Sequence, residues 1–121
     1  MRKKILIAED DPDIRETLQE LLEVGYEIVF AADGCEAINL LCKESFDLVM
    51  TDLKMPVKDG EAILKLARNS DNNSNVPILV ISAYITDQVR DRFGDQAGVS
   101  FLEKPYTLTE VEEAVQKMLA A

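Results

Sequence analysis

The sequence predicts one α/β domain, a doubly wound (βα)5 three-layer sandwich around a five-stranded parallel sheet in the order 2-1-3-4-5. Five short apolar runs alternate with five segments of helical periodicity along 121 residues. Short strands separated by helices cannot pair as hairpins, so the strands are expected to be parallel with right-handed crossovers. The hydrophobic share of 47% and the length both suit one packed globular domain, expected over residues 1–121.

The strand candidates are short apolar runs, and four of them end in polar or charged side chains. In chain order the runs are 5–8, 26–31, 48–51, 78–81 and 101–102. The groups that follow the four runs are Glu9 with Asp10, Asp52, Ser82, and Glu103 with Lys104. Because open α/β sheets bind ligands at the carboxyl ends of their strands, these groups are expected to share one functional edge.

The first two helices carry start and stop signals. Asp11 can cap the first helix, Pro12 fits its first turn, and Gly25 suits its end. Its apolar residues keep helical spacing from position 14 to position 22. A turn at 33–34 opens the second helix, whose apolar stripe consists of Ile38, Leu41 and Cys42 and ends near residue 45.

The last three helices follow in the same alternation. Residues 59–60 open the third, with apolar positions 63, 66 and 67 inward, and the polar stretch 69–75 is expected to be a mobile loop. The fourth has a thin apolar stripe at positions 85, 89 and 93. Thr107 and Glu110 form a capping-box pattern at the start of the fifth, whose apolar residues lie at 111, 115, 118 and 119.

Charge and cysteine content exclude several classes of protein. A net charge of −10 argues against binding a nucleic-acid backbone, since no basic excess can release counterions. Cys35 and Cys42 would lie roughly 10 Å apart along one helix, too far for a disulfide. The apolar run after the basic residues 2–4 is too short for a signal peptide or membrane span. We expect a soluble cytoplasmic protein.

The acidic groups at the sheet edge predict a cation site. Glu9 and Asp10 follow the first strand and Asp52 follows the third, and the order 2-1-3-4-5 places these strands at the switch point. Three neighbouring carboxylates repel one another, and Mg²⁺ relieves that repulsion with oxygen ligands. With the metal bound, a carboxylate oxygen can attack an activated phosphorus, while Lys104 supplies a second cation and Ser82 a hydroxyl. Any one of these residues alone would be unremarkable.

The residues then resemble a family, the receiver domain of bacterial two-component response regulators, over essentially the whole chain. The matching segments are 5–11 (ILIAEDD), 51–60 (TDLKMPVKDG), 81–83 (ISA) and 104–107 (KPYT). Together they are highly specific, although each alone is weak. The resemblance implies a flavodoxin-like fold and a phosphorelay protein that catalyses only its own phosphorylation and dephosphorylation.

The resemblance also implies residue roles. Asp52 would be the phosphoacceptor and would also bind Mg²⁺, which Glu9 and Asp10 would hold directly or through water and for which Mn²⁺ could substitute. The main-chain carbonyl of Lys54 would complete the metal site, whereas Asp11 is expected to serve as a helix cap. Lys54 and Tyr84 would flank the phosphoryl group and slow its hydrolysis, or else both would point to solvent.

A switch and its partners follow from the same resemblance. The Ser82 hydroxyl would move toward the phosphoryl group, Lys104 would contact it, and Phe101 would change rotamer, unless Phe101 is a plain core aromatic. Pro105 would follow a cis peptide bond. Phosphorylation would shift the packing of the fourth helix, fifth strand and fifth helix. That face would bind a downstream protein, a linked output domain or a second copy of the chain.

The donor must be another protein region, because the chain contains no histidine to carry a phosphoryl group. A sensor histidine kinase or a histidine phosphotransfer protein is expected. Three other functions are compatible with this topology to different degrees. A haloacid-dehalogenase-like phosphatase needs a second acid where Lys54 stands, and a flavodoxin-like cofactor carrier needs a small-residue phosphate turn where 9–12 is acidic. A receiver-like adaptor that works without phosphorylation is the remaining alternative.

Overall fold

Five parallel strands form the centre of the molecule, in a computed structural model that describes residues 2–52, 60–83, 85–93 and 98–120. The order across the sheet is β2-β1-β3-β4-β5, as the sequence predicts. The strands are β1 (Lys4–Ala8), β2 (Glu27–Ala31), β3 (Leu48–Thr51), β4 (Ile78–Ser82) and β5 (Val99–Glu103). Each lies within three residues of the apolar run that predicts it.

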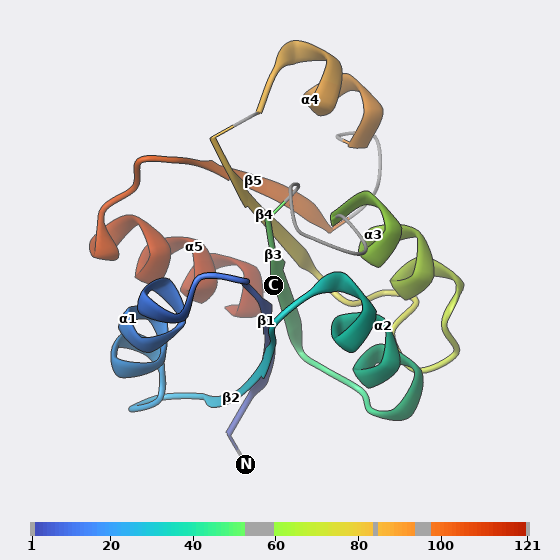
Figure 1. Cartoon of the computed structure of the whole chain (residues 1–121), viewed down its shortest axis with the longest axis horizontal. Helices are drawn as coiled ribbons and strands as arrows, with labels where there is room; N and C mark the ends of the chain where they lie inside the picture. Colours follow the sequence, from blue (N-terminus) through green and yellow to red (C-terminus); the bar gives the residue numbers. More distant parts are fainter. Residues whose placement is uncertain (1, 53–59, 84, 94–97, 121) are drawn as a thin grey trace.

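The helices cover both faces of this sheet. They are α1 (Pro12–Leu22), α2 (Gly34–Lys43), α3 (Gly60–Asn69), α4 (Asp87–Phe93) and α5 (Leu108–Ala120). Figure 1 views the sheet nearly edge-on, with α1 and α5 on its left face and α2 and α3 on its right, while α4 stands at the β5 end. This is the predicted three-layer sandwich. None of the helices in these ranges is long and apolar enough to cross a membrane.

Two hydrophobic clusters separate the layers. Alternate strand residues face α2 and α3, where Leu6, Val49 and Val80 pack with Ala37 and other helix residues. The intervening residues face α1 and α5, where Met50 and Ile81 belong to the second cluster. β3 and β4 are buried along their whole length and β1 is buried from Ile5 to Ala8, because both of their faces are covered.

Local capping explains where three helices begin. The Asp11 carboxylate accepts a hydrogen bond from the Asp13 backbone N–H at 2.9 Å, and Asp33 accepts one from the Glu36 N–H. Thr107 and Glu110 form the predicted reciprocal capping box, because each side chain bonds the other residue's backbone N–H. The first and fifth helices therefore start where the sequence predicts.

Three details differ from the predictions. Cys42 is exposed rather than part of the inward stripe of α2, so both thiols face solvent, and Leu64 of α3 is buried although the predicted stripe omits it. Ile85 is buried but precedes α4 instead of lying within it. The polar stretch 69–75 also contains Asn73, which is 2% exposed.

Asn73 makes the prediction of a mobile loop wrong at that position. Its amide group donates to the carbonyls of Leu41 and Glu44, both at 2.8 Å, and its side-chain oxygen accepts from the Phe46 N–H at 2.9 Å. These bonds tie the loop after α3 to the end of α2 and the approach to β3. Asparagine is usual in loops, and only tertiary structure reveals which one is buried.

Candidate functional site

Strand register places the predicted site residues at one edge of the sheet. Ala8 of β1 pairs with Thr51 of β3, so the residues that follow them, Glu9 and Asp52, leave adjacent strands at the same level. On the far side of β3, Ser82 of β4 pairs with Glu103 of β5, directly before Lys104. The sheet order therefore brings together groups that are up to 95 positions apart in sequence (9 and 104).

Asp52 and Lys104 form an ion pair across this edge. The Lys104 Nζ donates to Asp52 Oδ2 at 2.7 Å, and the two side chains are 24% and 12% exposed. Burial acts to lower the pKa of Lys104, but the hydrogen bond to Asp52 and the negative charges of Asp52 and Glu9 outweigh it and raise that pKa. The lysine is thus held as a cation beside an accessible carboxylate.

Glu9 is the most deeply placed acid of the site, with 6% of its surface exposed. Its Oε1 accepts from the Asp11 backbone N–H at 3.2 Å, and its backbone carbonyl accepts from Arg15 Nη1 at 3.1 Å. Burial raises the pKa of the Glu9 carboxyl, and the charges of Asp52 and Asp10 raise it further against the opposing effect of Lys104. Burial is therefore the main factor that disfavours the ionised form of Glu9, and the neighbouring carboxylates add to it.

Asp10 and Asp11 continue from Glu9 into α1 with different roles. Asp10 is exposed at the rim of the site, where its carboxylate can meet a ligand from solvent. Asp11 is occupied as the N-cap of α1, which confirms the capping role that the sequence predicts for it. The neighbouring acids are thereby separated into a buried one, a rim one and a structural one.

The side chains at this edge have the chemistry that a hard cation binds. Among the described residues, however, they do not form a complete set of metal ligands. No group of three or more His, Cys, Asp or Glu side chains in the described ranges is gathered as a metal site. Glu9 and Asp10 nevertheless offer the carboxylate oxygens that Mg²⁺ prefers, and it commonly keeps several waters as its remaining ligands. Burial raises the pKa of Glu9 and so disfavours its ionised form, which a bound cation would favour. The predicted carbonyl ligand of Lys54, like Tyr84, lies outside the described residues.

Ser82 and Phe101 share the sheet face that looks toward α3 and α4. Phe101 pairs with Val80, and both pack with the cluster on that face, while Ser82 lies two residues beyond Val80 and so projects the same way. Ser82 is fully buried, and its carbonyl accepts from the Lys104 N–H at 3.0 Å. The Lys104–Pro105 peptide bond is cis, as predicted.

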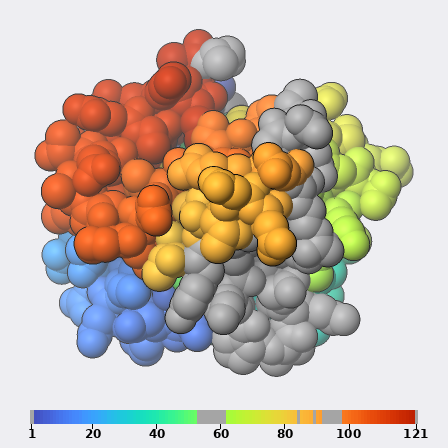
Figure 2. Space-filling view, turned by 90° about the horizontal axis from the view of Figure 1, so that it is seen from above, coloured from blue at the N-terminus to red at the C-terminus, as the bar shows by residue number. Residues whose placement is uncertain are grey.

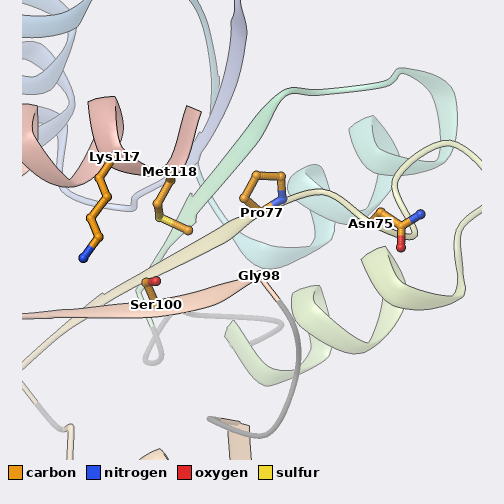
Figure 3. A pocket seen from close by; sticks show the side chains of 6 residues that line it. All are labelled: Asn75, Pro77, Gly98, Ser100, Lys117 and Met118. Atoms are coloured by element: carbon orange, nitrogen blue, oxygen red, sulfur yellow. The ribbon is translucent and has the colours of Figure 1, made fainter. Parts of the chain in front are cut away.

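Two hollows adjoin the sheet at opposite edges. An open groove of about 450 Å³ lies beside the ion pair, between α1 and the end of β5, and its lining includes Ile14, Lys104 and Tyr106. A second pocket of about 440 Å³ lies where β4 and β5 begin, with Lys117 and Met118 of α5 on one side and Pro77 opposite (Figure 3). Only the first one touches a predicted site residue.

Sequence reasoning missed two arginines that contact site residues. Arg15 supports the Glu9 carbonyl, and Arg90 of α4 lies over the Phe101 ring. Arg15 lies four residues after the helix cap, which places it on the first turn, but this spacing alone does not reveal its contact. The sequence around Arg90 does not predict its contact with Phe101, because this contact depends on how α4 crosses β5.

Comparison with known proteins identifies the family. The model of the response regulator receiver domain matches residues 5–116. The chain is 33% identical over 120 residues to sporulation initiation phosphotransferase F of Bacillus subtilis, covering 98% of this chain and 95% of that protein. Other relatives are longer, and the chain spans 12% of one sensor histidine kinase and 55% of one transcriptional regulator.

Solved structures agree with the fold. The receiver domain of the hybrid histidine kinase CckA is 34% identical, with a TM-score of 0.81 over 96% of this chain and 98% of that one. The receiver domain of the sensor histidine kinase PA1611 from Pseudomonas aeruginosa has a TM-score of 0.87 at 24% identity, with full coverage of both chains. That structure is described with a magnesium ion coordinated in its active-site cleft.

Proposed function

The chain belongs to the response regulator receiver domain family, and from this premise we propose that it accepts a phosphoryl group on Asp52 in a Mg²⁺-dependent reaction. A sensor histidine kinase or a histidine phosphotransfer protein is the donor. The chain has no histidine of its own, so the phosphohistidine lies on another protein region. The reaction modifies the domain itself, and its purpose is regulatory.

The observation that carries this proposal is the Asp52–Lys104 pair at the carboxyl edge of the sheet. A 2.7 Å contact holds an ammonium group against one oxygen of a carboxylate that solvent still reaches. A phosphoryl group that arrives at Asp52 brings oxygens that carry negative charge. Lys104 can contact those oxygens from where it stands, with little rearrangement.

The remaining residues have complementary roles in this proposal. An Asp52 carboxylate oxygen forms a bond to phosphorus as the bond from phosphorus to the donor imidazole nitrogen breaks. Ser82, buried beside the site, supplies a hydroxyl to a phosphoryl oxygen. Glu9, Asp10 and Asp52 would hold the Mg²⁺, or Mn²⁺ in its place, together with the Lys54 carbonyl. When bound, the metal would supply neutralisation of the charge on the carboxylate and the phosphoryl oxygens.

Access to the site supports a protein donor. The groove beside Lys104 opens to solvent, and its apolar walls include Ile14 of α1 and Pro105 with Tyr106 after β5. The Tyr106 hydroxyl is neutral at physiological pH like that of any tyrosine, and burial raises its pKa further. A donor helix can rest there while its phosphohistidine reaches Asp52.

The output is a shift between two packings of the surface formed by α4, β5 and α5. Ser82 and Phe101 link the phosphoryl site to this surface, since both project from the same sheet face and Arg90 of α4 contacts the Phe101 ring there. A phosphorylated site that draws Ser82 inward changes the space beside Phe101 and thereby favours one packing. The surface then engages a downstream protein, a linked output domain or a second copy of the chain.

The deciding experiment is intact mass after incubation with a small acyl phosphate, with and without Mg²⁺. The native chain should gain one phosphoryl group only when Mg²⁺ is present, and Asp52→Ala should gain none. Asp71→Ala, which removes an exposed carboxylate from a turn, is the matched control and should behave as the native chain.

Two results would contradict the proposal. Undiminished uptake by Asp52→Ala would place the phosphoryl group elsewhere. No uptake by the native chain, from the acyl phosphate or from a phosphorylated histidine phosphotransfer protein, would instead favour an adaptor that binds partners unmodified. Partner binding that persists in Asp52→Ala would then support the adaptor function.

A further inference from the structure

The Phe101 ring has an unusual neighbour on the side away from the sheet. The guanidinium carbon of Arg90 lies 5.5 Å from the ring centroid, within the range of a cation–π contact. Phe101 is half-buried on β5, and Arg90 is exposed on α4. The contact therefore joins two elements that the chain connects only through residues 94–98.

α4 is otherwise placed at the outside of the molecule. Figure 2 looks down on this face and shows α4 in the middle, with α5 and the end of β5 on its left. Its first turn is fixed by the Arg90 N–H, which donates to the Thr86 carbonyl at 3.0 Å, and by the buried Ile85 just before it. The backbone of Arg90 is thus held in a defined position, from which its side chain can lie over the Phe101 ring.

We infer that Arg90 is a positioning residue, whose guanidinium holds the Phe101 ring in its present orientation and so favours the unphosphorylated packing of α4 against β5. The inference deepens the proposed function and rests on it, because it assigns a resting restraint to the same switch. Arginine suits this task because its planar guanidinium stacks on an aromatic face while its outer edge stays in water.

The contact is weak enough to allow switching. An exposed cation–π pair shifts a two-state balance by about two- to five-fold. Phosphorylation at Asp52 can overcome such a bias, whereas loss of the guanidinium should move the resting population toward the phosphorylated packing by the same factor. A stronger pair would keep α4 in the unphosphorylated packing even after phosphorylation. A purely apolar contact would not depend on the orientation of the Phe101 ring.

The first measurement follows the Phe101 ring by NMR in the unphosphorylated chain, with phenylalanine labelled on its ring. Four phenylalanines give four sets of signals, and Phe101→Leu identifies the one required. Arg90→Met removes the charge but keeps an unbranched stem, and Arg90→Lys keeps a cation. Lys3→Met is the matched control, because it removes one exposed positive charge before β1.

The second measurement is the rate of phosphoryl uptake from a small acyl phosphate, followed by intact mass. Arg90→Met should shift the Phe101 signals and raise the rate about two- to five-fold, while Lys3→Met changes neither and Arg90→Lys falls between. Circular dichroism confirms that each variant is folded.

Either measurement can overturn the inference. Unchanged Phe101 signals in Arg90→Met would show that the guanidinium does not hold the ring. Shifted signals with an unchanged or slower rate would show that the contact does not restrain the switch. If the native chain takes up no phosphoryl group, the proposed function fails and the coupling fails with it, while the NMR result still decides whether the contact exists.

Discussion

Three charged side chains set the electrostatic character of the site. Lys104 compensates Asp52 through a direct 2.7 Å contact, whereas the buried Glu9 carboxylate accepts a hydrogen bond from the Asp11 backbone N–H at 3.2 Å. The charges of Asp52 and Asp10 add to the burial that raises the pKa of Glu9. Without a bound cation, ionised Glu9 thus destabilises the fold, and this is the condition under which a divalent ion binds best.

A substitution at Glu9 should separate stability from metal binding. Glu9→Gln keeps the side chain's size but removes the buried charge, so in metal-free buffer at pH 7.5 the Tm should rise by roughly 2–6 °C. The same change should abolish most of the additional stability that Mg²⁺ gives the native chain. Differential scanning calorimetry with EDTA and with MgCl₂ measures both effects.

The matched control for this prediction is Glu16→Gln, which removes an exposed carboxylate from α1. It should leave both the metal-free Tm and the response to Mg²⁺ nearly unchanged. A lower metal-free Tm for Glu9→Gln would mean that the Glu9 carboxylate stabilises the fold, contrary to the balance of charges described here.

At the scale of single residues, the sequence predicted which side chains lie at the site but not all of their contacts. Acids and a lysine at successive strand ends predicted the edge, and register brought Glu9, Asp52 and Lys104 to it. The roles assigned to these residues in phosphoryl transfer stay predictions. Arg15 and Arg90 escaped notice, because a long side chain on a helix can reach several neighbours and only packing decides which one it meets.

At the scale of secondary-structure elements, the loop after α3 differs most from what the sequence predicts. Asn73 satisfies two carbonyls around the end of α2 and the N–H of Phe46, all three through one buried amide. A helix end leaves its last carbonyls without partners within the helix. Asn73 supplies those partners from a segment about 30 residues later (41 and 44 to 73), so α2 and the loop before β4 stabilise each other.

Loss of the Asn73 side chain should lower the free energy of unfolding, although Asn73 lies in a polar loop. Asn73→Ala leaves the Phe46 N–H without its buried acceptor and removes the shorter of two side-chain hydrogen bonds to the Leu41 carbonyl, which Ser70 Oγ also contacts at 3.4 Å. We expect about 2–4 kcal/mol less stability towards urea unfolding. Asn72→Ala, at the exposed neighbouring position, should change stability by less than about 0.5 kcal/mol. Equal effects of the two substitutions would contradict the structural role of Asn73.

Sequence predicted elements well where patterning and capping agree. The capping box of Thr107 and Glu110 and the N-cap Asp11 place two helix starts correctly, since such signals act within one turn. Alternation of strands and helices with short connections predicts a parallel doubly wound sheet, although alternation by itself does not fix the strand order. The exposure of Cys42 depends on how α2 rotates against the sheet, which a short apolar stripe does not fix. Ile85 is buried outside α4 because that helix begins two residues later, at Asp87.

The molecule as a whole carries a net charge of −10, which affects any test of cation binding. Self-repulsion of a strongly charged chain is weakened by any salt, because mobile ions screen it. A rise in stability with MgCl₂ therefore has a general part and a specific part. The specific part belongs to the edge where Glu9 and Asp10 leave β1, and the general part is spread over the surface.

Thermal unfolding can separate these parts. At a Mg²⁺ concentration ten times the dissociation constant, specific binding adds about 1.4 kcal/mol, or roughly 5 °C in Tm. NaCl at the same ionic strength should give a smaller rise from screening alone. Asp10→Asn should respond equally to both salts, while Asp71→Asn, with the same change in charge on an exposed turn, should keep the full response to Mg²⁺. If NaCl matched MgCl₂ for the native chain, its stabilisation would come from screening, and the sheet edge would not be a cation site.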